Sequence, residues 1–229
     1  TAASNTGPLV SGADSNKGKR KCSRELASSR AKKPSSSAAS SNLFGGPFID
    51  AGFAEVILPA IAEPDVWYDR SGREIEGQMW TFEDKGGRPC TLIPEATALL
   101  QREYRERWGK SLPKPIRVFY EQRCYRYERP QAGRYREFTQ FGIEVLGPGD
   151  YEAECRSLLV DALKATGVEC DIDGDAVRGL SYYSRNGFEA RVEALGAQKQ
   201  VAGGGSYENG CGWAVGVDRL ALAAMKQNS

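Results

Sequence analysis

Arginine and glutamate side chains are concentrated between residues 117 and 147 of the 229-residue chain. The planar guanidinium of arginine makes paired contacts with phosphates and carboxylates, so a cluster of arginines is typical of a site for such ligands. A charged surface hairpin is the structural alternative for the same stretch. Its charged residues are Arg117, Arg123, Arg126, Arg129, Arg134 and Arg136, with Glu121, Glu128, Glu137 and Glu144.

The chain contains no histidine. This excludes an imidazole base and histidine metal ligands. Six cysteines are scattered without a Cys-x-x-Cys pair, a usage that fits a reducing compartment such as the cytoplasm better than disulfides or zinc. Any chemistry must therefore rest on arginines, carboxylates, positioning and magnesium bound with a substrate.

Two strands joined by a polar loop must position these charges. Residues 117–125 alternate at the period of a strand, and residues 138–146 form a second strand rich in aromatic and branched side chains. Residues 129–135 lie between them and contain proline and glycine, which turn the chain. Because Arg126 and Glu128 have the same parity, we expect both to point to the same side.

The segment Arg126-Tyr-Glu128, the loop after it and Arg134-x-Arg136-Glu-Phe138 resemble motif 2 of the class II aminoacyl-tRNA synthetases. Residues 125–147 as a whole are similar to that motif in the histidyl-tRNA synthetase family. The resemblance implies an α+β fold in which an antiparallel sheet flanked by helices carries the active site. It also implies a ligase that uses ATP and magnesium to activate histidine by adenylation, with transfer to tRNA as a further step.

The same resemblance assigns residues to ATP. Arg126 and Arg178 match arginines that neutralise the α-phosphate, and they are the expected catalytic residues. Arg219 lies in a Gly-x-Asp-Arg segment within residues 212–225, which resembles motif 3 and is expected to form a strand and a helix. The ATP-binding residues implied are Arg126, Glu128 at the adenine amino group, Phe138 at the adenine ring, and Arg134 and Arg219 at the γ-phosphate.

Further segments resemble the parts of the family that bind the amino acid. Residues 93–97, Ile-Pro-Glu-Ala-Thr, are similar to the family's Arg-Pro-Glu-Gly-Thr, residues 176–191 to its tyrosine signature, and residues 202–208 to its glycine-rich segment. The chain departs from the family pattern at Ile93, Ala96, Ser181 and Ser206. The amino-acid-binding residues implied are Glu95, Thr97 and Gln140 for the α-amino group, Glu144 and Tyr183 for the imidazole, and Tyr182 and Gly204 in the pocket. The structural alternative for Glu95 is a carboxylate that stabilises a helix N-terminus. The structural alternative for Tyr182 and Tyr183 is packing in the core.

The rest of the chain predicts the elements around this site. Residues 47–67 resemble motif 1, whose strand lies at a two-fold dimer interface, so we expect a homodimer. The expected elements are a strand at 54–58, a hairpin at 78–92, a helix from there to residue 107, an amphipathic helix at 151–166 and a brief strand at 168–172.

Residues 1–42 and 43–229 differ in composition. The first segment has few large apolar residues and predicts a disordered tail. Between Lys17 and Lys33 it carries eight Lys or Arg against Glu25 alone, which fits a solvated tail, an arm that binds tRNA or an organellar targeting peptide. Residues 43–229 are expected to be the catalytic domain, without the helical insertion of the family and without its C-terminal anticodon-binding domain.

Three classes of function remain open. The net charge of +1 shows no strong bias toward nucleic acid, and no apolar run reaches the length of a membrane span. The first class is the histidine-activating enzyme. The second is a non-catalytic histidine-sensing protein, such as the synthetase-like regulatory subunit of ATP phosphoribosyltransferase, and the third is a structural subunit of a larger assembly. The presence of four arginines favours the enzyme, because a sensor does not need Arg126, Arg134, Arg178 and Arg219 together.

Overall fold

The computed structural model describes residues 45–68, 71, 73–177, 179–184, 187–196 and 198–228. The predicted disordered tail, Cys22 and Arg178 lie outside the described residues. The five described cysteines carry thiols and form no disulfide with one another. No helix in the described part of the chain is long and apolar enough to cross a membrane.

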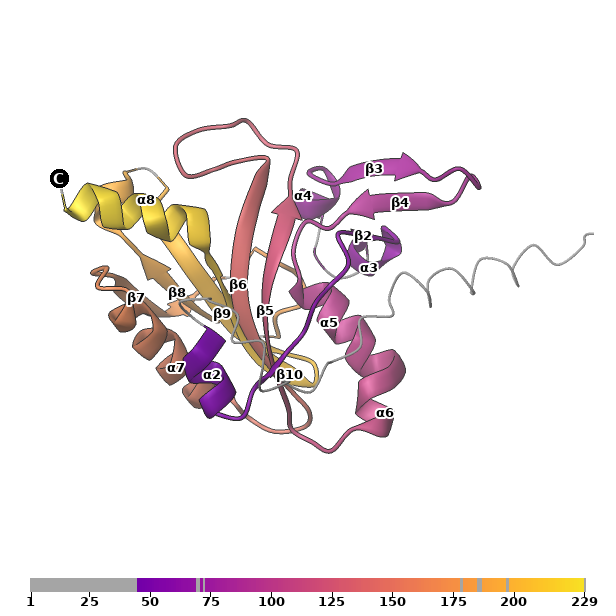
Figure 1. The fold of residues 1–229 in the computed structure, drawn as a ribbon, viewed down its shortest axis with the longest axis horizontal. Helices are drawn as coiled ribbons and strands as arrows, with labels where there is room; N and C mark the ends of the chain where they lie inside the picture. The colour runs from indigo at the N-terminus through magenta and orange to yellow at the C-terminus, as the bar shows by residue number, and fades with distance from the viewer. Residues whose placement is uncertain are drawn as a thin grey trace, which may run out of the picture.

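A seven-stranded sheet forms the centre of the fold (Figure 1). β1 pairs with β5 in parallel, and every other neighbouring pair of this sheet is antiparallel. The predicted sheet is therefore confirmed, with one parallel strand at its edge. In spatial order the strands are β1 (Ala54–Glu55), β5 (Ile116–Tyr125), β6 (Glu137–Leu146), β10 (Gly210–Gly216), β9 (Gln200–Tyr207), β8 (Gly187–Arg191) and β7 (Asp171–Ala176).

Helices cover both faces of this sheet. Figure 1 shows α2 and α7 on one side of it and the α5–α6 segment on the other. The helices are α2 (Gly45–Asp50), α5 (Thr97–Glu103), the π-helix η1 (Tyr104–Trp108), α6 (Gly109–Ser111), α7 (Glu152–Ala165), the 3₁₀ turn η2 (Glu193–Leu195) and α8 (Val217–Gln227).

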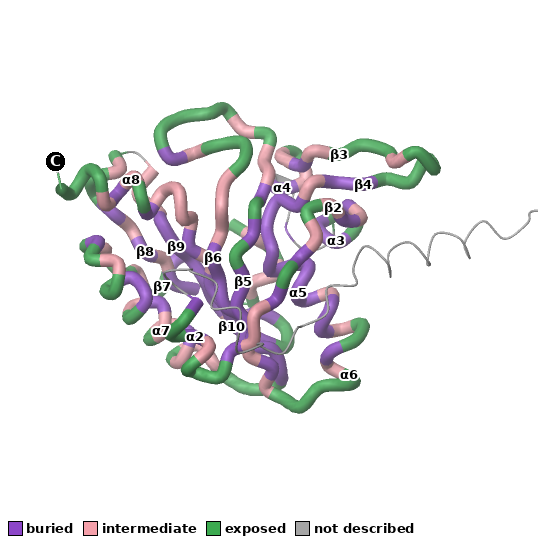
Figure 2. The backbone as a smooth tube through the Cα atoms, in the orientation of Figure 1, coloured by how far each residue is buried: buried purple, intermediate pink, exposed green. Residues whose placement is uncertain are grey.

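The alternation of strand side chains sorts the core into two layers. Phe119 of β5 and Phe141 and Ile143 of β6 belong to the core that also contains residues of α2, α7 and α8. Val118 and Tyr120, one residue away on β5, belong to the other core, with residues of α5. Figure 2 shows the buried residues running along the central strands between these layers. The face that carries Val118 and Tyr120 is the face that holds the site.

A smaller sheet lies at the end of β5 and β6 where their connecting loop projects (Figure 1). The backbone amide of Tyr127 donates to the carbonyl of Gln78 (2.7 Å), and the rings of Trp80 and Tyr127 meet edge to face with centroids 5.0 Å apart. The predicted hairpin at 78–92 is confirmed as β3 and β4. The elements here are β2 (Ile61–Ala62), α3 (Asp65–Tyr68), α4 (Arg73–Glu76), β3 (Trp80–Glu83) and β4 (Pro89–Leu92).

Three predicted elements differ in extent. The strand expected at 54–58 ends at residue 55, although the amide of Val56 still donates to the carbonyl of Phe119 (2.9 Å). The helix expected to end at residue 107 continues through η1 to residue 111. The strand expected at 168–172 begins at residue 171, because Gly167 closes α7 at φ +73° and Gln227 of α8 holds both backbone groups of Glu169.

Candidate functional site

The site lies on the second face of the sheet, at the end where β5 and β6 separate. The register pairs Gln122 with Gln140 and Val118 with Glu144, so side chains of this parity share one face. The residues after β5 leave the sheet, and both Arg126 and Glu128 line a cavity there, as their shared parity predicted.

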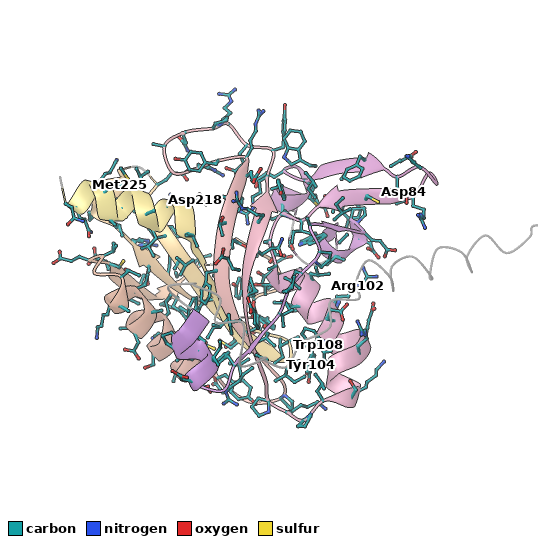
Figure 3. The ribbon with its side chains drawn as sticks, viewed as in Figure 1. Asp84, Arg102, Tyr104, Trp108, Asp218 and Met225 are labelled. Atoms are coloured by element: carbon teal, nitrogen blue, oxygen red, sulfur yellow. The ribbon has the colours of Figure 1, made fainter. Side chains whose placement is uncertain are left out.

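This cavity has a volume of about 700 Å³ and collects most of the predicted site residues. Those that line it are Glu95, Thr97, Arg126, Glu128, Arg134, Phe138, Gln140, Tyr182, Tyr183 and Arg219. Glu144 and Gly204 do not line it, and Arg178 lies outside the described residues. Asp218 also lines it from the start of α8, and Figure 3 shows this residue beside the central strands, far from Tyr104 and Trp108.

Glu95 forms part of the wall of the cavity just before α5, and its side chain is buried. Its carboxylate accepts hydrogen bonds from the indole of Trp67 (2.8 Å), the hydroxyl of Ser71 (3.3 Å) and the amide of Ala98 (3.2 Å). Burial raises the pKa of Glu95, while the amide of Ala98, the charge of Arg126 and the indole act in the opposite direction. The net direction is upward, so a cationic amine beside Glu95 would favour its charged form and be held by it.

Glu144 lies beneath the cavity and does not line its wall, and the prediction that it recognises an imidazole stays a prediction. Its exposed fraction is 0%. The hydroxyl of Thr97 donates to one carboxyl oxygen (2.6 Å) and the phenol of Tyr207 to the other (2.5 Å). Burial raises the pKa of Glu144 to about 8, against the effect of these two donors. The amino-acid end of the cavity therefore rests on a buried carboxyl that both hydroxyls already hold.

Three tyrosines form the wall above Glu144. The rings of Tyr182 and Tyr183 lie 4.6 Å apart, and those of Tyr182 and Tyr207 meet edge to face at 6.0 Å. A backbone bridge joins Tyr183 to Tyr207. Burial raises the pKa values of Tyr182 and Tyr207 well above their ordinary values, so both phenols stay protonated. The three rings pack on one another, and Tyr182 and Tyr183 also line the cavity, so their role in binding an amino acid stays a prediction.

The arginines line the cavity in two places: Arg126 lies beside Glu95, whereas Arg134 and Arg219 lie near one another. The guanidinium of Arg126 lies 5.2 Å from the ring centroid of Phe138 and donates to the carbonyl of Pro94 (3.0 Å). Arg134 forms an ion pair with Glu128. Arg126 and Arg134 thus contact Phe138 and Glu128, the two residues predicted to bind adenine.

Arg219 completes this end of the cavity. It donates to the carbonyl of Gln198, and burial together with the nearby charge of Arg134 lowers its pKa. Two arginines that repel one another in a partly buried wall are stabilised by an anion between them. The carboxylate of the neighbouring Asp218 accepts a hydrogen bond from the backbone amide of Thr139 (2.6 Å). This bond fixes the start of α8 against β6.

Gly204 packs tightly between neighbouring strands. A Cβ at this position would lie 2.5 Å from Cβ of Trp213 and 2.8 Å from the ring of Phe188, so the strands leave no room for a side chain, and its place in the amino-acid pocket stays a prediction. Gly212, directly across from Glu144 in the register, has no room for a Cβ because the carboxyl of Glu144 occupies that space. These glycines shape the floor under the site.

The sequence did not single out two residues that hold the site together. Tyr207 was visible in the glycine-rich segment but received no role, and it holds Glu144 from 63 residues away. Trp67 bonds Glu95 across 28 residues, and nothing in its local sequence marks it. No group of three or more Cys, Asp or Glu that could hold a metal occurs among the described residues.

The profile of the histidyl-tRNA synthetase family matches residues 38–173, which is more than half of the chain. The chain belongs to the histidyl-tRNA synthetase family. It is 45% identical over 171 residues to the histidine–tRNA ligase of Methanosarcina acetivorans, covering 66% of this chain and 41% of that protein. The chain thus spans about two fifths of the length of this relative. To the histidine–tRNA ligase of Methanospirillum hungatei it is 29% identical over 276 positions, covering 75% of this chain and 67% of the relative.

Solved structures support the same fold for this synthetase-like chain. The apo histidyl-tRNA synthetase of S. aureus superposes with a TM-score of 0.63 at 24% identity, covering 79% of this chain and 63% of that one. A Bacillus halodurans protein described as an ATP phosphoribosyltransferase regulatory subunit/histidyl-tRNA synthetase gives a TM-score of 0.63 at 16% identity, covering 79% and 77%. At these identities the likeness concerns the fold.

Proposed function

We propose that this chain activates histidine with ATP to form histidyl-adenylate. The observation that carries the proposal is a single cavity whose wall holds Glu95, Thr97 and Gln140, which suit an amino acid, together with Arg126, Arg134 and Arg219, which suit phosphates. Such a cavity suits a zwitterionic amino acid beside a polyphosphate. Membership of the histidyl-tRNA synthetase family supports the same reaction.

The reaction needs no protein base. An oxygen of the histidine carboxylate, already ionised at neutral pH, attacks the α-phosphorus of ATP in line with the leaving group. A new O–P bond forms, the bond between the α-phosphorus and its bridging oxygen breaks, and pyrophosphate leaves with that oxygen and the electron pair. Catalysis then consists of positioning and charge stabilisation, which a chain without histidine residues can supply.

Each end of the cavity has a proposed task. Arg126 would leave the carbonyl of Pro94 to meet the charge that builds on the α-phosphate, together with Arg178 as the sequence predicts. Arg134 and Arg219 would hold the γ-phosphate, while Phe138 would stack on adenine and Glu128 would accept its amino group. Magnesium bound with ATP would neutralise phosphate charge. Glu189 and Asp218, two carboxylates that line the cavity, would supply oxygen ligands for it.

Selection of histidine is assigned to the other end. The imidazole would lie against Tyr183 and above Thr97 and Tyr207, whose hydroxyls connect it to the Glu144 carboxyl beneath. Because the hydroxyls of Thr97 and Tyr207 are hydrogen-bonded to Glu144, their orientation toward the imidazole ring is fixed. An apolar amino acid would leave these groups unpaired, which disfavours it.

Further parts of the proposal concern partners. Transfer of histidine to tRNA, with help from the basic tail, follows from the family, and a cytoplasmic location follows from cysteine usage.

A two-fold dimer is proposed because β1 lies at the sheet edge and Ile57, just after it, is 62% exposed. Sedimentation at micromolar concentration should give twice the monomer mass, and a monomer would contradict the dimer.

Amino-acid-dependent exchange of labelled pyrophosphate into ATP tests the enzyme directly. Histidine should support exchange and the other amino acids should not. Binding of histidine without exchange would instead favour a sensing protein, a class to which the likeness to the B. halodurans structure draws attention. Failure to bind either ATP or histidine would leave the structural subunit.

A further inference from the structure

The indole of Trp67 and the carboxylate of Glu95 form a buried hydrogen bond that links two helical segments. Trp67 is 0% exposed, and its Nε1 donates to Oε1 of Glu95 at 2.8 Å. Arg102 on α5 reinforces this arrangement, because it pairs with Glu63 (3.0 Å) and Asp65 (3.2 Å) at the start of α3. These ion pairs hold α3 against α5, and so they fix the position of Trp67 relative to Glu95.

The bonds to Glu95 are divided unequally between its two oxygens. Trp67 and Ser71 both donate to Oε1. No described side chain bonds to Oε2, which receives the backbone amide of Ala98 at 3.3 Å. Since Glu95 lines the cavity, the less occupied oxygen is the one left for a ligand.

The hydrogen bond also bears on the charge of Glu95. Burial raises the pKa of this carboxyl, and the indole is one of the groups that oppose the rise. An indole N–H can only donate, so it favours the carboxylate over the neutral acid. A carboxylate that became neutral would lose its attraction for an ammonium group.

We propose that Trp67 is a positioning residue for amino-acid binding: its N–H holds one oxygen of Glu95 so that the other is presented to the α-ammonium of the substrate. This inference rests on the proposed function, and it names a residue outside the cavity wall. It predicts that Trp67 affects recognition of the amine and of no other part of the ligand.

The substitution Trp67→Phe removes the N–H and keeps most of the ring. Isothermal titration should compare histidine, histidinol, which keeps the α-amine but lacks the carboxylate, and 3-(imidazol-4-yl)propionate, which lacks the α-amine. Affinity for the first two should fall about 10- to 100-fold, the usual cost of losing a hydrogen bond to a charged group. Affinity for the third should stay unchanged. A variant that is merely distorted would weaken all three ligands.

Trp213→Phe is the matched control, because Trp213 is also buried and its Nε1 has no hydrogen-bond partner among the described residues. It should leave all three affinities as they are.

In pyrophosphate exchange, Trp67→Phe should raise the KM for histidine, leave the KM for ATP unchanged, and move the acidic limb of the kcat/KM profile to higher pH.

The wild-type protein gives a test that does not depend on folding of a variant. The indole ¹⁵N–H signal of Trp67 should shift with pH as Glu95 titrates, and this shift should be absent in Glu95→Gln. An unresponsive signal, or equal loss of all three ligands in Trp67→Phe, would overturn the assignment of Trp67 while leaving the activity intact. A wild-type protein that neither exchanges pyrophosphate nor binds histidine would overturn the proposed function and the assignment with it.

Discussion

The two ends of the cavity are built on opposite principles. At the amino-acid end, Glu95 and Glu144 are buried and their oxygens already accept hydrogen bonds from neighbouring side chains. At the nucleotide end, Arg126 and Arg134 are bound to groups that ATP is proposed to displace or share. The first end is organised before a ligand arrives, whereas the second must exchange its internal contacts for phosphate.

This difference suggests a division of labour. A preorganised pocket gives selectivity, because unpaired buried groups penalise the wrong ligand. Arginines that exchange a carbonyl or carboxylate for phosphate lose little on binding, since they keep a charged or polar partner throughout. Substitutions at the two ends should therefore change different kinetic constants.

The largest effect is expected at the nucleotide end. Arg126→Ala should lower the rate of pyrophosphate exchange by about 100- to 1,000-fold, because one charged donor to the reacting phosphate is lost. Arg178→Ala should do the same if its role from the sequence is right. Arg123→Ala is the matched control, since this arginine pairs with Glu137 on the exposed side of β5. Equal rates in the Arg126 and Arg123 variants would contradict the assignment.

A smaller, different effect is expected at the amino-acid end. Glu144→Ala should raise the KM for histidine roughly 10-fold or more and admit other amino acids, because the hydroxyls of Thr97 and Tyr207 lose their acceptor. The maximal exchange rate should change less than in Arg126→Ala. Glu103→Ala provides the comparison, since this buried glutamate pairs with Arg107 away from the cavity and should affect stability without changing selectivity.

The buried carboxyl of Glu144 should also appear in the pH dependence of stability. Its pKa is raised to about 8 in the folded protein, so the native state keeps a proton that the unfolded state has lost above its ordinary pKa. Stability from this group is full at low pH and falls through neutral pH, by on the order of 1 kcal/mol per pH unit up to about pH 8. Urea unfolding of the wild type should show this slope and Glu144→Gln should reduce it; parallel slopes would argue against a neutral buried carboxyl.

The smallest effect on catalysis is expected from the basic tail. Removing residues 1–42 should leave pyrophosphate exchange unchanged, because the described residues that line the cavity begin at Ile75. If the tail is an RNA-binding arm, the deletion should weaken tRNA binding and flatten its dependence on salt. Unchanged affinity at several salt concentrations would leave the tail as a solvated segment.

The sequence predicted the framework of the site better than its internal contacts. The period of residues 117–125 and 138–146 predicted β5 and β6, because alternation is a local property of the chain. Whether a glutamate is exposed or buried does not depend on its neighbours in the sequence alone. Glu144 is buried because Thr97, Tyr207 and a glycine on β10 surround it, and these residues lie far apart in the chain.

Charge pairing could not be predicted for a similar reason. The family resemblance assigned separate tasks to Arg134 and Glu128, yet the loop between β5 and β6 brings them together. Likewise the start of β7 depends on Gln227 of the last helix, which no pattern near residue 168 reveals.

The glycine at position 212 has a consequence for how this pocket could change. Every replacement at that position adds atoms where the Glu144 carboxyl now lies, so mutation of Gly212 can only remove space and never create it. A laboratory search for variants that accept larger amino acids would find its productive changes at Thr97, Tyr183 and Tyr207 instead. Position 212 thus fixes the space around the Glu144 carboxyl, and the adjustable part of the specificity lies in side chains of α5, of the segment at Tyr183 and of β9.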